Sequence, residues 1–168
     1  VDGTQIVTHA QLAIAAPPPS ILLAALGPRM LRFAGQRTQG TSLGQCGPKT
    51  ISNYVLPHIT EGAESAGREA PRVMALVRVC VTDDYAGAFE HAKAISAFYQ
   101  TLPSYAAVIA REGLAHPADL HLIGSWQQVL DGLAAYGRAG VTDVRLEIAA
   151  HTPKAREATH AAVAEYLA

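Results

Sequence analysis

The ten residues GTSLGQCGPK, 40–49, contain two spacings that could serve chemistry. The first is Gly-x-Ser-x-Gly, in which Ser42 takes the position of a hydrolase nucleophile. The second is a glycine-rich turn, with Gly44, Gly47 and Pro48 directly before a helix-like run, and such a turn presents free backbone N–H groups to a phosphate. A third interpretation is a tight turn that uses glycine for its geometry alone.

A nucleophile elbow requires its serine on a sharp turn between a strand and a helix. The residues before Ser42, 35–39, are polar and typical of a helix end, so Ser42 is predicted to lie inside a strand. Asp83 or Asp84 together with His151 could complete a triad, but a chain of this length offers such partners by chance. The sequence therefore favours an ordinary strand residue, with a serine hydrolase as an alternative.

The anion interpretation has more support from neighbouring residues. Lys49 adds a positive charge beside the turn, and Gly27, Pro28 and Arg29 repeat the arrangement one unit earlier. A helix that begins there would direct the positive end of its dipole toward a bound anion. Glycine is common in the turns between strands and helices. The interpretation as a turn that binds no ligand is therefore still an alternative.

Arg78 lies inside the most apolar run of the chain, RVMALVRVCV (72–81), which reads as a strand buried on both faces. A buried arginine needs a partner or an anion. Glu147 and Asp143, on a later predicted strand, are the expected ion-pair partners.

Seven histidines raise the question of a metal site. His116, Asp119 and His121 are the closest set, but they lack an established zinc spacing. We therefore expect surface or capping histidines and no metal. Cys46 and Cys80 form no disulfide framework, which favours a reducing compartment and a cytoplasmic location.

The composition excludes several partner classes. A formal charge of −1 gives no reason to expect nucleic acid or a membrane surface. The apolar run at 10–26 is interrupted by three prolines, 17–19, and is too broken to span a bilayer. The 168 residues suffice for one domain with a sizeable core.

The order of predicted elements indicates an α/β fold. Strands are expected at 20–25, 40–44, 72–81 and 143–148, and helices at 28–36, 49–66, 84–99, 124–140 and from 153 to 167. An additional helical piece at 102–113 and a short extended piece at 120–124 lie between the third and fourth strands. Ser125 and Gln128 form a capping box. Four strand–helix units call for a parallel sheet, either open or half of an eight-unit barrel.

Several stretches of the chain resemble a known family when taken in their order and spacing. They are ILLAALGPRMLRFAG (21–35), PHITEGAESAGREAPRV (57–73), VTDDYAGAFEHAK (81–93), LPSYAAVIAREG (102–113) and AGVTDVRLEI (139–148). Together they resemble the luciferase-like monooxygenase superfamily, and most closely its branch that depends on the deazaflavin coenzyme F420. The likeness runs from about Pro17 to the end.

The resemblance implies the C-terminal half of a (β/α)8 TIM-type barrel, with four β/α units and parallel strands. The chain would be a single domain, 1–168, in which 17–168 supply units five to eight. Residues 1–16 would be a lead-in, with Thr4, Ile6 and Thr8 on one face of a short extended segment.

The resemblance also implies a cofactor site at the carboxyl ends of the strands. Ala25, Leu26 and Gly27 would lie beside the cofactor. The loop of Gly44, Gln45, Cys46, Gly47, Pro48 and Lys49 would hold its phosphate. The family usually has Ala-Asp-Gly where this chain has Thr38, Gln39 and Gly40. No catalytic residue is carried over by motif, so none is assigned.

The function that the resemblance implies is that of a fragment or subunit of an F420-dependent oxidoreductase, which transfers hydride between the deazaflavin and a small organic substrate. FMN is the alternative cofactor and would indicate a monooxygenase. A half barrel exposes two sheet edges. We therefore expect a partner, either a complementing N-terminal half barrel or a second copy in a homo-oligomer. A non-catalytic oligomer that keeps only the fold and the anion site is a further alternative.

Overall fold

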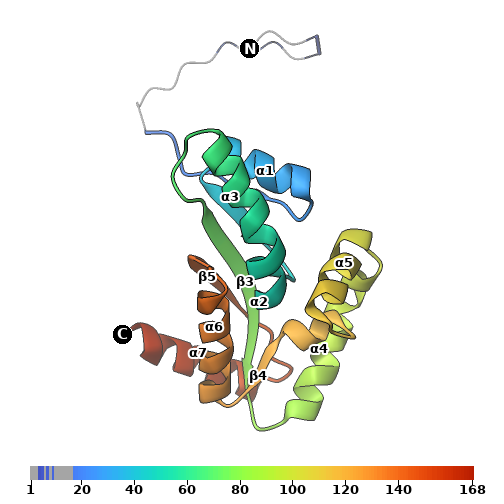
Figure 1. Cartoon of the computed structure of the whole chain (residues 1–168). Coiled ribbons are helices and arrows are strands. Elements are labelled where there is room, and N and C mark those ends of the chain that lie inside the picture. Colours follow the sequence, from blue (N-terminus) through green and yellow to red (C-terminus); the bar gives the residue numbers. More distant parts are fainter. Residues whose placement is uncertain (1–3, 6, 8, 10–16) are drawn as a thin grey trace.

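The structure is a computed structural model that describes residues 4, 5, 7, 9 and 17–168. A sheet of five strands runs through it, and every strand pair is parallel (Figure 1). The predicted extended segment of the lead-in depends on Ile6 and Thr8, which lie outside the described residues.

The elements follow the predicted order closely. The strands are β1 (Leu22–Ala24), β2 (Gly40–Leu43), β3 (Arg72–Val81), β4 (Leu122–Gly124) and β5 (Asp143–Ile148). The helices are α1 (Pro28–Arg37), α2 (Pro48–Thr50), the π-helical η1 (Ile51–Val55), α3 (Leu56–Ser65), α4 (Tyr85–Gln100), α5 (Pro103–Glu112), the 3₁₀ turn η2 (Pro117–Leu120), α6 (Trp126–Arg138) and α7 (Pro153–Leu167). The predicted α/β fold with parallel strands is confirmed.

Strand β3 is the centre of the sheet. Its first residues, 72–75, pair with β2, its last residues, 79–81, pair with β4, and residues 74–79 pair with β5. The amides of Arg72 and Thr82 donate to Gln39 and Gly124, so β2 and β4 share one edge of β3. Among the described strands, β1, β4 and β5 each have a single neighbour.

The two faces of β3 differ in burial. Val73, Ala75, Val77 and Val79 are at most 1% exposed, and helices α1, α3 and α6 supply part of that core, together with β2, η1 and Val108 of α5. The opposite face carries Met74, Leu76 and Arg78, which are only half-buried. The prediction that β3 is buried on both faces is therefore wrong for one of them. The register places Asp143, Arg145 and Glu147 of β5 on that same face, so it is the more polar face of the sheet.

The run from Pro48 to Ser65 is helical throughout, but it changes type. The Leu56 amide donates to the Ile51 carbonyl, five residues back, in the π-helical stretch just before Pro57. Pro57 has no amide hydrogen to donate, and a local change of register is one way for a helix to accommodate a proline. The helix therefore accommodates this proline with a π-helical turn and continues to Ser65.

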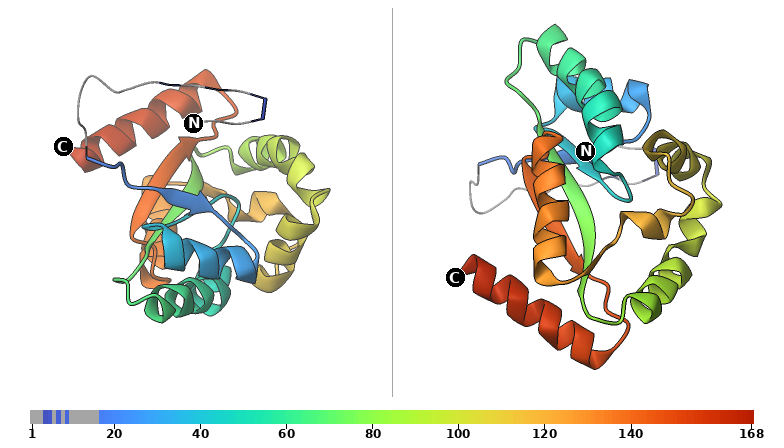
Figure 2. Two further views of the ribbon diagram at one scale, coloured as in Figure 1. Left: turned by 90° about the horizontal axis from the view of Figure 1, so that it is seen from above. Right: turned by 60° about the horizontal axis from the view of Figure 1, so that its bottom comes forward.

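The remaining helices lie around β3 in two groups. Figure 1 and the right view of Figure 2 show α6 beside β3 and β5, with α4 and α5 on the other side of β3. The turns that lead into α4, α6 and α7 gather at the carboxyl end of β3, because the last residues of β4 and β5 pair with Val81 and Val79 near that end.

Candidate functional site

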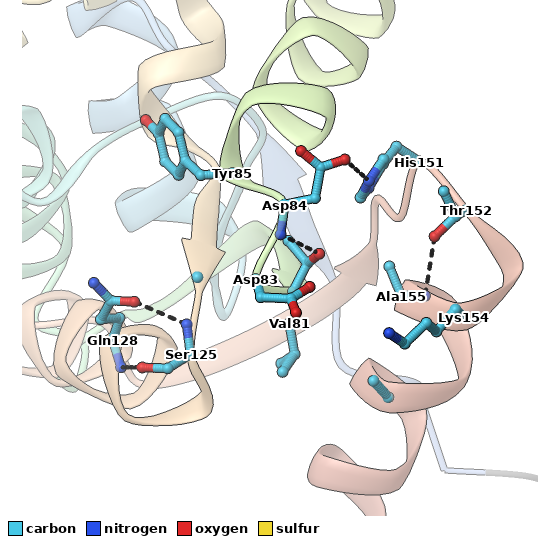
Figure 3. A pocket seen from close by; sticks show the side chains of 13 residues that line it. Val81, Asp83, Asp84, Tyr85, Ser125, Gln128, His151, Thr152, Lys154 and Ala155 are labelled. Atoms are coloured by element: carbon cyan, nitrogen blue, oxygen red, sulfur yellow. Dashed lines mark hydrogen bonds and ion pairs between the residues drawn. The ribbon is translucent and has the colours of Figure 1, made fainter.

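A cavity of about 860 Å³ opens at the carboxyl ends of β3 and β4 and beside the turn that follows β5. Its lining consists of residues 81–85, 124, 125, 128, 151, 152, 154, 155 and 158. Figure 3 shows these side chains arriving from three separate segments of the chain. In parallel α/β sheets, ligands bind at the carboxyl ends of the strands, so this cavity is the principal candidate site.

Three helices begin at the cavity, and each has its first turn capped by a side chain. The Gly87 amide donates to Asp84 at 2.9 Å, the Gln128 amide to Ser125 at 3.3 Å, and the Ala155 amide to Thr152 at 3.1 Å. The capping residues thus do two things: they satisfy amides that the helix leaves unpaired, and they line the cavity.

Asp84 and His151 tie two of these turns together. The His151 Nε2 atom lies 3.0 Å from Asp84 Oδ2, so the turn after β3 is joined to the turn after β5 (Figure 3). The amide of Gly87, and after it His151, lower the pKa of the Asp84 carboxyl. Asp84 is therefore a stable carboxylate at neutral pH, and it orients the imidazole ring.

The thiol of Cys80 lies behind this pair, with Sγ 4.0 Å from His151 Nδ1. Cys80 is 1% exposed, and burial raises its pKa. A buried neutral thiol is a poor nucleophile. The group of Cys80, His151 and Asp84 therefore supports the turns and does not form a thiol active site.

Two charged side chains of the lining are exposed and unpaired among the described residues, Asp83 and Lys154. Lys154 follows directly on the capped start of α7, and Asp83 lies in the turn after β3. Tyr85 is 56% exposed and stacks on Phe89, with ring centroids 5.6 Å apart. The cavity thus offers one cation, the carboxylates of Asp83 and Asp84, and one aromatic side chain to a ligand.

Ser42 lies within β2, where it pairs with Ala24 and Met74. It is neither on a strand-to-helix turn nor in the lining of the cavity that contains Asp84 and His151. The predicted interpretation of Ser42 as a strand residue agrees with the structure, and the geometry of a nucleophile elbow is not present there.

The predicted cofactor residues after β1 lie at the carboxyl end of that strand. Ala25 is 6% exposed, Leu26 is half-buried and Gly27 is exposed at the start of α1. None of the three lines the large cavity.

The predicted phosphate loop, 44–49, follows β2 and is mostly packed. Gln45, Cys46 and Gly47 are buried, Gly44 and Pro48 are half-buried, and Lys49 is exposed. The Thr50 amide, in the first turn of the helix, donates to Glu112 Oε1 at 2.6 Å. A carboxylate of the chain itself therefore occupies the position in which the glycine pattern predicts an external anion.

The packing around this carboxylate explains the glycine at position 47. A Cβ atom there would lie 2.5 Å from the Glu112 Cδ atom and 2.7 Å from Leu120 Cδ2. Glu112 belongs to α5, far along the chain from the loop, so a local pattern could not reveal it. Its presence also raises the pKa of the Cys46 thiol to about 12, although burial is the larger cause.

The stagger of the strands separates the loop from the cavity. Leu43, the last residue of β2, pairs with Ala75, and β3 continues to Val81. Six further residues at about 3.3 Å each place the end of β3 about 20 Å beyond the end of β2. The structure therefore brings together the turns after β3, β4 and β5, and it leaves residues 25–27 and 44–49 outside that cavity. In the sequence, parts of the lining were visible as the Ser125–Gln128 capping box and as Asp83, Asp84 and His151, the possible partners of Ser42.

The remaining sequence predictions concern Arg78 and the histidines. Arg78 Nε donates to Glu147 Oε1 at 3.0 Å, as predicted, while Asp143 pairs with Arg72. His116 Nδ1 accepts from the Ala118 amide at 2.9 Å, so it is a capping residue, again as predicted. No group of three potential metal ligands occurs among the residues that the structure describes.

Comparison with known proteins assigns the family. The luciferase-like monooxygenase family matches residues 2–143, and the chain belongs to this family. No curated protein matches the chain. No described helix combines the length and apolar character needed to cross a bilayer.

Solved structures support the same fold. An F420-dependent secondary alcohol dehydrogenase in complex with an F420-acetone adduct superimposes with a TM-score of 0.66 at 18% identity, over 80% of this chain and 44% of that one. A coenzyme F420-dependent tetrahydromethanopterin reductase from Methanopyrus kandleri gives 0.65 at 24% identity, over 80% and 46%. The monooxygenase RslO1 from Streptomyces bottropensis gives 0.56 at 17% identity, over 89% and 47%. The chain spans about half the length of these proteins, and its fold is a partial barrel of their type.

Proposed function

We propose that this chain is part of a coenzyme F420-dependent oxidoreductase that transfers hydride between the deazaflavin and a small organic substrate. The observation that carries the proposal is the cavity of about 860 Å³ at the carboxyl ends of β3 and β4, in a member of the luciferase-like family. Active sites of TIM-type barrels lie at that end of the strands. Two of the structural neighbours are described as F420-dependent.

The residues present fit a ligand with a planar ring and an anionic tail. The cavity volume is within the range of small-molecule sites. Val81, Ala155 and Ala158 provide apolar surface, while Ser125 and Gln128 provide hydrogen-bonding groups. Lys154 supplies a positive charge that no described residue neutralises. When bound, the deazaflavin would supply the atom that gives or accepts hydride.

The chain's own residues would bind and orient this group. Lys154 would hold an anionic substituent, with the capped start of α7 beside it adding the positive end of a helix dipole. The Asp84–His151 pair would keep the α4 and α7 turns at a fixed separation, because it joins them directly. Tyr85, which is exposed and lines the large cavity, would shield one side of the ligand from water.

Two alternatives have an observation in their favour. An FMN-dependent monooxygenase is suggested by the likeness to RslO1, which is described as a monooxygenase. A non-catalytic chain is suggested by Glu112, because a carboxylate of the protein already satisfies the turn predicted to hold a phosphate.

We also propose that this sheet is completed by other β-strands. β1 and β5 each have one neighbour among the described strands, and the polar face of the sheet is only half-buried. A complementing N-terminal half barrel would cover both edges, and a second copy of this chain would do so by symmetry. Native mass spectrometry separates the two: a stable even-numbered oligomer supports the second copy, whereas aggregation supports a missing half.

Fluorescence titration of the purified chain with F420, and separately with FMN, tests the cofactor. We expect saturable binding of F420 in the micromolar range and at least tenfold weaker binding of FMN. Tighter binding of FMN would favour the monooxygenase alternative. No saturable change with either cofactor would contradict the proposal and favour the non-catalytic chain.

A further inference from the structure

Three buried polar atoms have no hydrogen-bond partner among the residues that the structure describes. They are Gln45 Nε2, Arg78 Nη1 and His121 Nδ1. All three residues line one small internal cavity of about 10 Å³, which is separate from the large one. Since buried polar groups in native proteins are almost always paired with protein or with ordered water, the convergence of three such atoms on one cavity indicates a binding site.

Two of these atoms are hydrogen-bond donors. The Gln45 side chain belongs to a residue that is 5% exposed, and its Nε2 carries two hydrogens. The Arg78 side chain is 11% exposed, and its Nε atom is already used by Glu147 at 3.0 Å. Burial acts to lower the pKa of Arg78, but hydrogen bonds to Tyr99 and Glu147 outweigh it and hold the pKa above its usual value. The guanidinium therefore stays charged, and its Nη1 can only donate.

The third atom can accept. His121 is 8% exposed, and its Nε2 lies 3.0 Å from Ser96 Oγ. Burial first, and then the charge of Arg78, lower the pKa of His121 to about 4, so the ring is neutral at physiological pH. A neutral ring carries one proton. With that proton on Nε2, donated to Ser96, the unpaired Nδ1 is an acceptor, and His121 lines the cavity.

We propose that Gln45, Arg78 and His121 bind one internal water molecule, which accepts hydrogen bonds from Gln45 Nε2 and Arg78 Nη1 and donates one to His121 Nδ1. The cavity volume matches that needed for a single water, and three hydrogen bonds are typical of a buried one. An anion such as chloride is disfavoured, because Glu147 already neutralises Arg78 and the imidazole is uncharged.

The water would join three segments that are distant in sequence. Gln45 lies in the turn after β2, Arg78 lies in β3, and His121 directly precedes β4. Gln45 is also the one described non-glycine residue with a positive φ, 48°. Glycine or asparagine adopts this conformation more readily than glutamine. A side chain that reaches the water explains why a glutamine occupies the position.

A crystal structure of this chain, with one crystal transferred to bromide, identifies the guest. We expect one density peak within about 2.7–3.2 Å of all three atoms, with no anomalous signal from bromide. A bromide peak in the cavity would overturn the proposal in favour of an anion site. A direct contact between the Gln45 side-chain oxygen and Arg78, without a guest, would overturn it as well.

The variants Gln45→Asn and Gln45→Gly test the site in solution. If Gln45 serves only the turn, both variants should raise the thermal midpoint, because both residues suit the left-handed conformation. If its amide holds the water, both should lower the midpoint by about 3 °C or more. Gln100→Asn, at an exposed glutamine, is the matched control and should change it by less than about 1 °C. A rise in the midpoint of Gln45→Gly would contradict the proposal.

Discussion

The two ends of β3 are built in opposite ways. Beside its beginning, the turn after β2 is packed and buried, and Glu112 satisfies the first turn of the helix that follows. At its other end, the turns into α4, α6 and α7 surround a cavity of about 860 Å³ that retains exposed charges on Asp83 and Lys154. The region whose sequence most resembles a binding motif is closed by its own side chains. The region that is open has no glycine-rich motif, and its sequence shows mainly a helix-capping box and the Asp84 and His151 side chains.

This difference shows that a glycine-rich turn does not by itself indicate an open anion site. Gly47 is required because Glu112 and Leu120 occupy the space of a Cβ atom, which is a packing requirement. Capping side chains such as Ser125 and Thr152 leave neighbouring positions free for a ligand because they satisfy the helix amides themselves.

The largest effect that we expect concerns His121, which shares the small internal cavity with Gln45 of the packed loop. Its pKa of about 4 in the folded state lies below the unfolded value of about 6.5, so the unfolded chain binds more protons between these values. Stability is therefore lost as the pH falls from about 6.5 to about 4, by roughly 2–3 kcal/mol at pH 4.5. Denaturant unfolding of the wild type and of His121→Gln at pH 7.5 and 4.5 checks this. Between these two pH values the variant should lose less free energy of unfolding than the wild type. Equal losses would show that His121 titrates normally.

The next effect tests the packing of the loop. Gly47→Ala should destabilise the chain by about 2 kcal/mol, because the new Cβ displaces Glu112 from the Thr50 amide. Gly137→Ala is the matched control: no atom lies within 4 Å of its Cβ position, and the helix should gain about 0.5–1 kcal/mol. Urea unfolding measures both. If Gly47→Ala has the stability of the wild type, the loop is not closely packed. That result would contradict the contrast between the packed and the open end of β3.

A smaller effect is expected at the open end. Thr152→Ala removes the cap of α7 and should cost about 1 kcal/mol, because the Ala155 amide loses its acceptor. Ser104→Ala, at an exposed serine near the start of α5, serves as the control and should change stability by less than about 0.5 kcal/mol. If the two variants have the same free energy of unfolding, the Thr152 side chain does not stabilise the start of α7 beside the cavity.

The sequence predicted what depends on local pattern and on strand register. The strand 72–81 and the Ser125–Gln128 capping box appear as predicted, because apolar runs and caps act over a few residues. The Arg78–Glu147 pair also follows from the parallel alignment of two strands. These features needed no knowledge of distant contacts.

The site was less predictable because it depends on long-range geometry. The stagger between β2 and β3 is not encoded in either strand alone, and it moves the 44–49 loop away from the cavity. Glu112 reaches the loop from a helix 62 residues from Thr50. One face of β3 is only half-buried and carries charged residues of β5, and the apolar run in β3 alone does not predict what packs over that face.

The most direct test of the proposed cofactor site compares two lysines. Affinity for F420 should be measured by fluorescence titration in Lys154→Ala and Lys49→Ala, both exposed positions at which an alanine leaves the fold intact. We expect Lys154→Ala to weaken binding about tenfold, equivalent to about 1.4 kcal/mol, and Lys49→Ala to change it by less than about twofold. The reverse result would place the anionic part of the cofactor on the loop after β2 and contradict the assignment of the cavity.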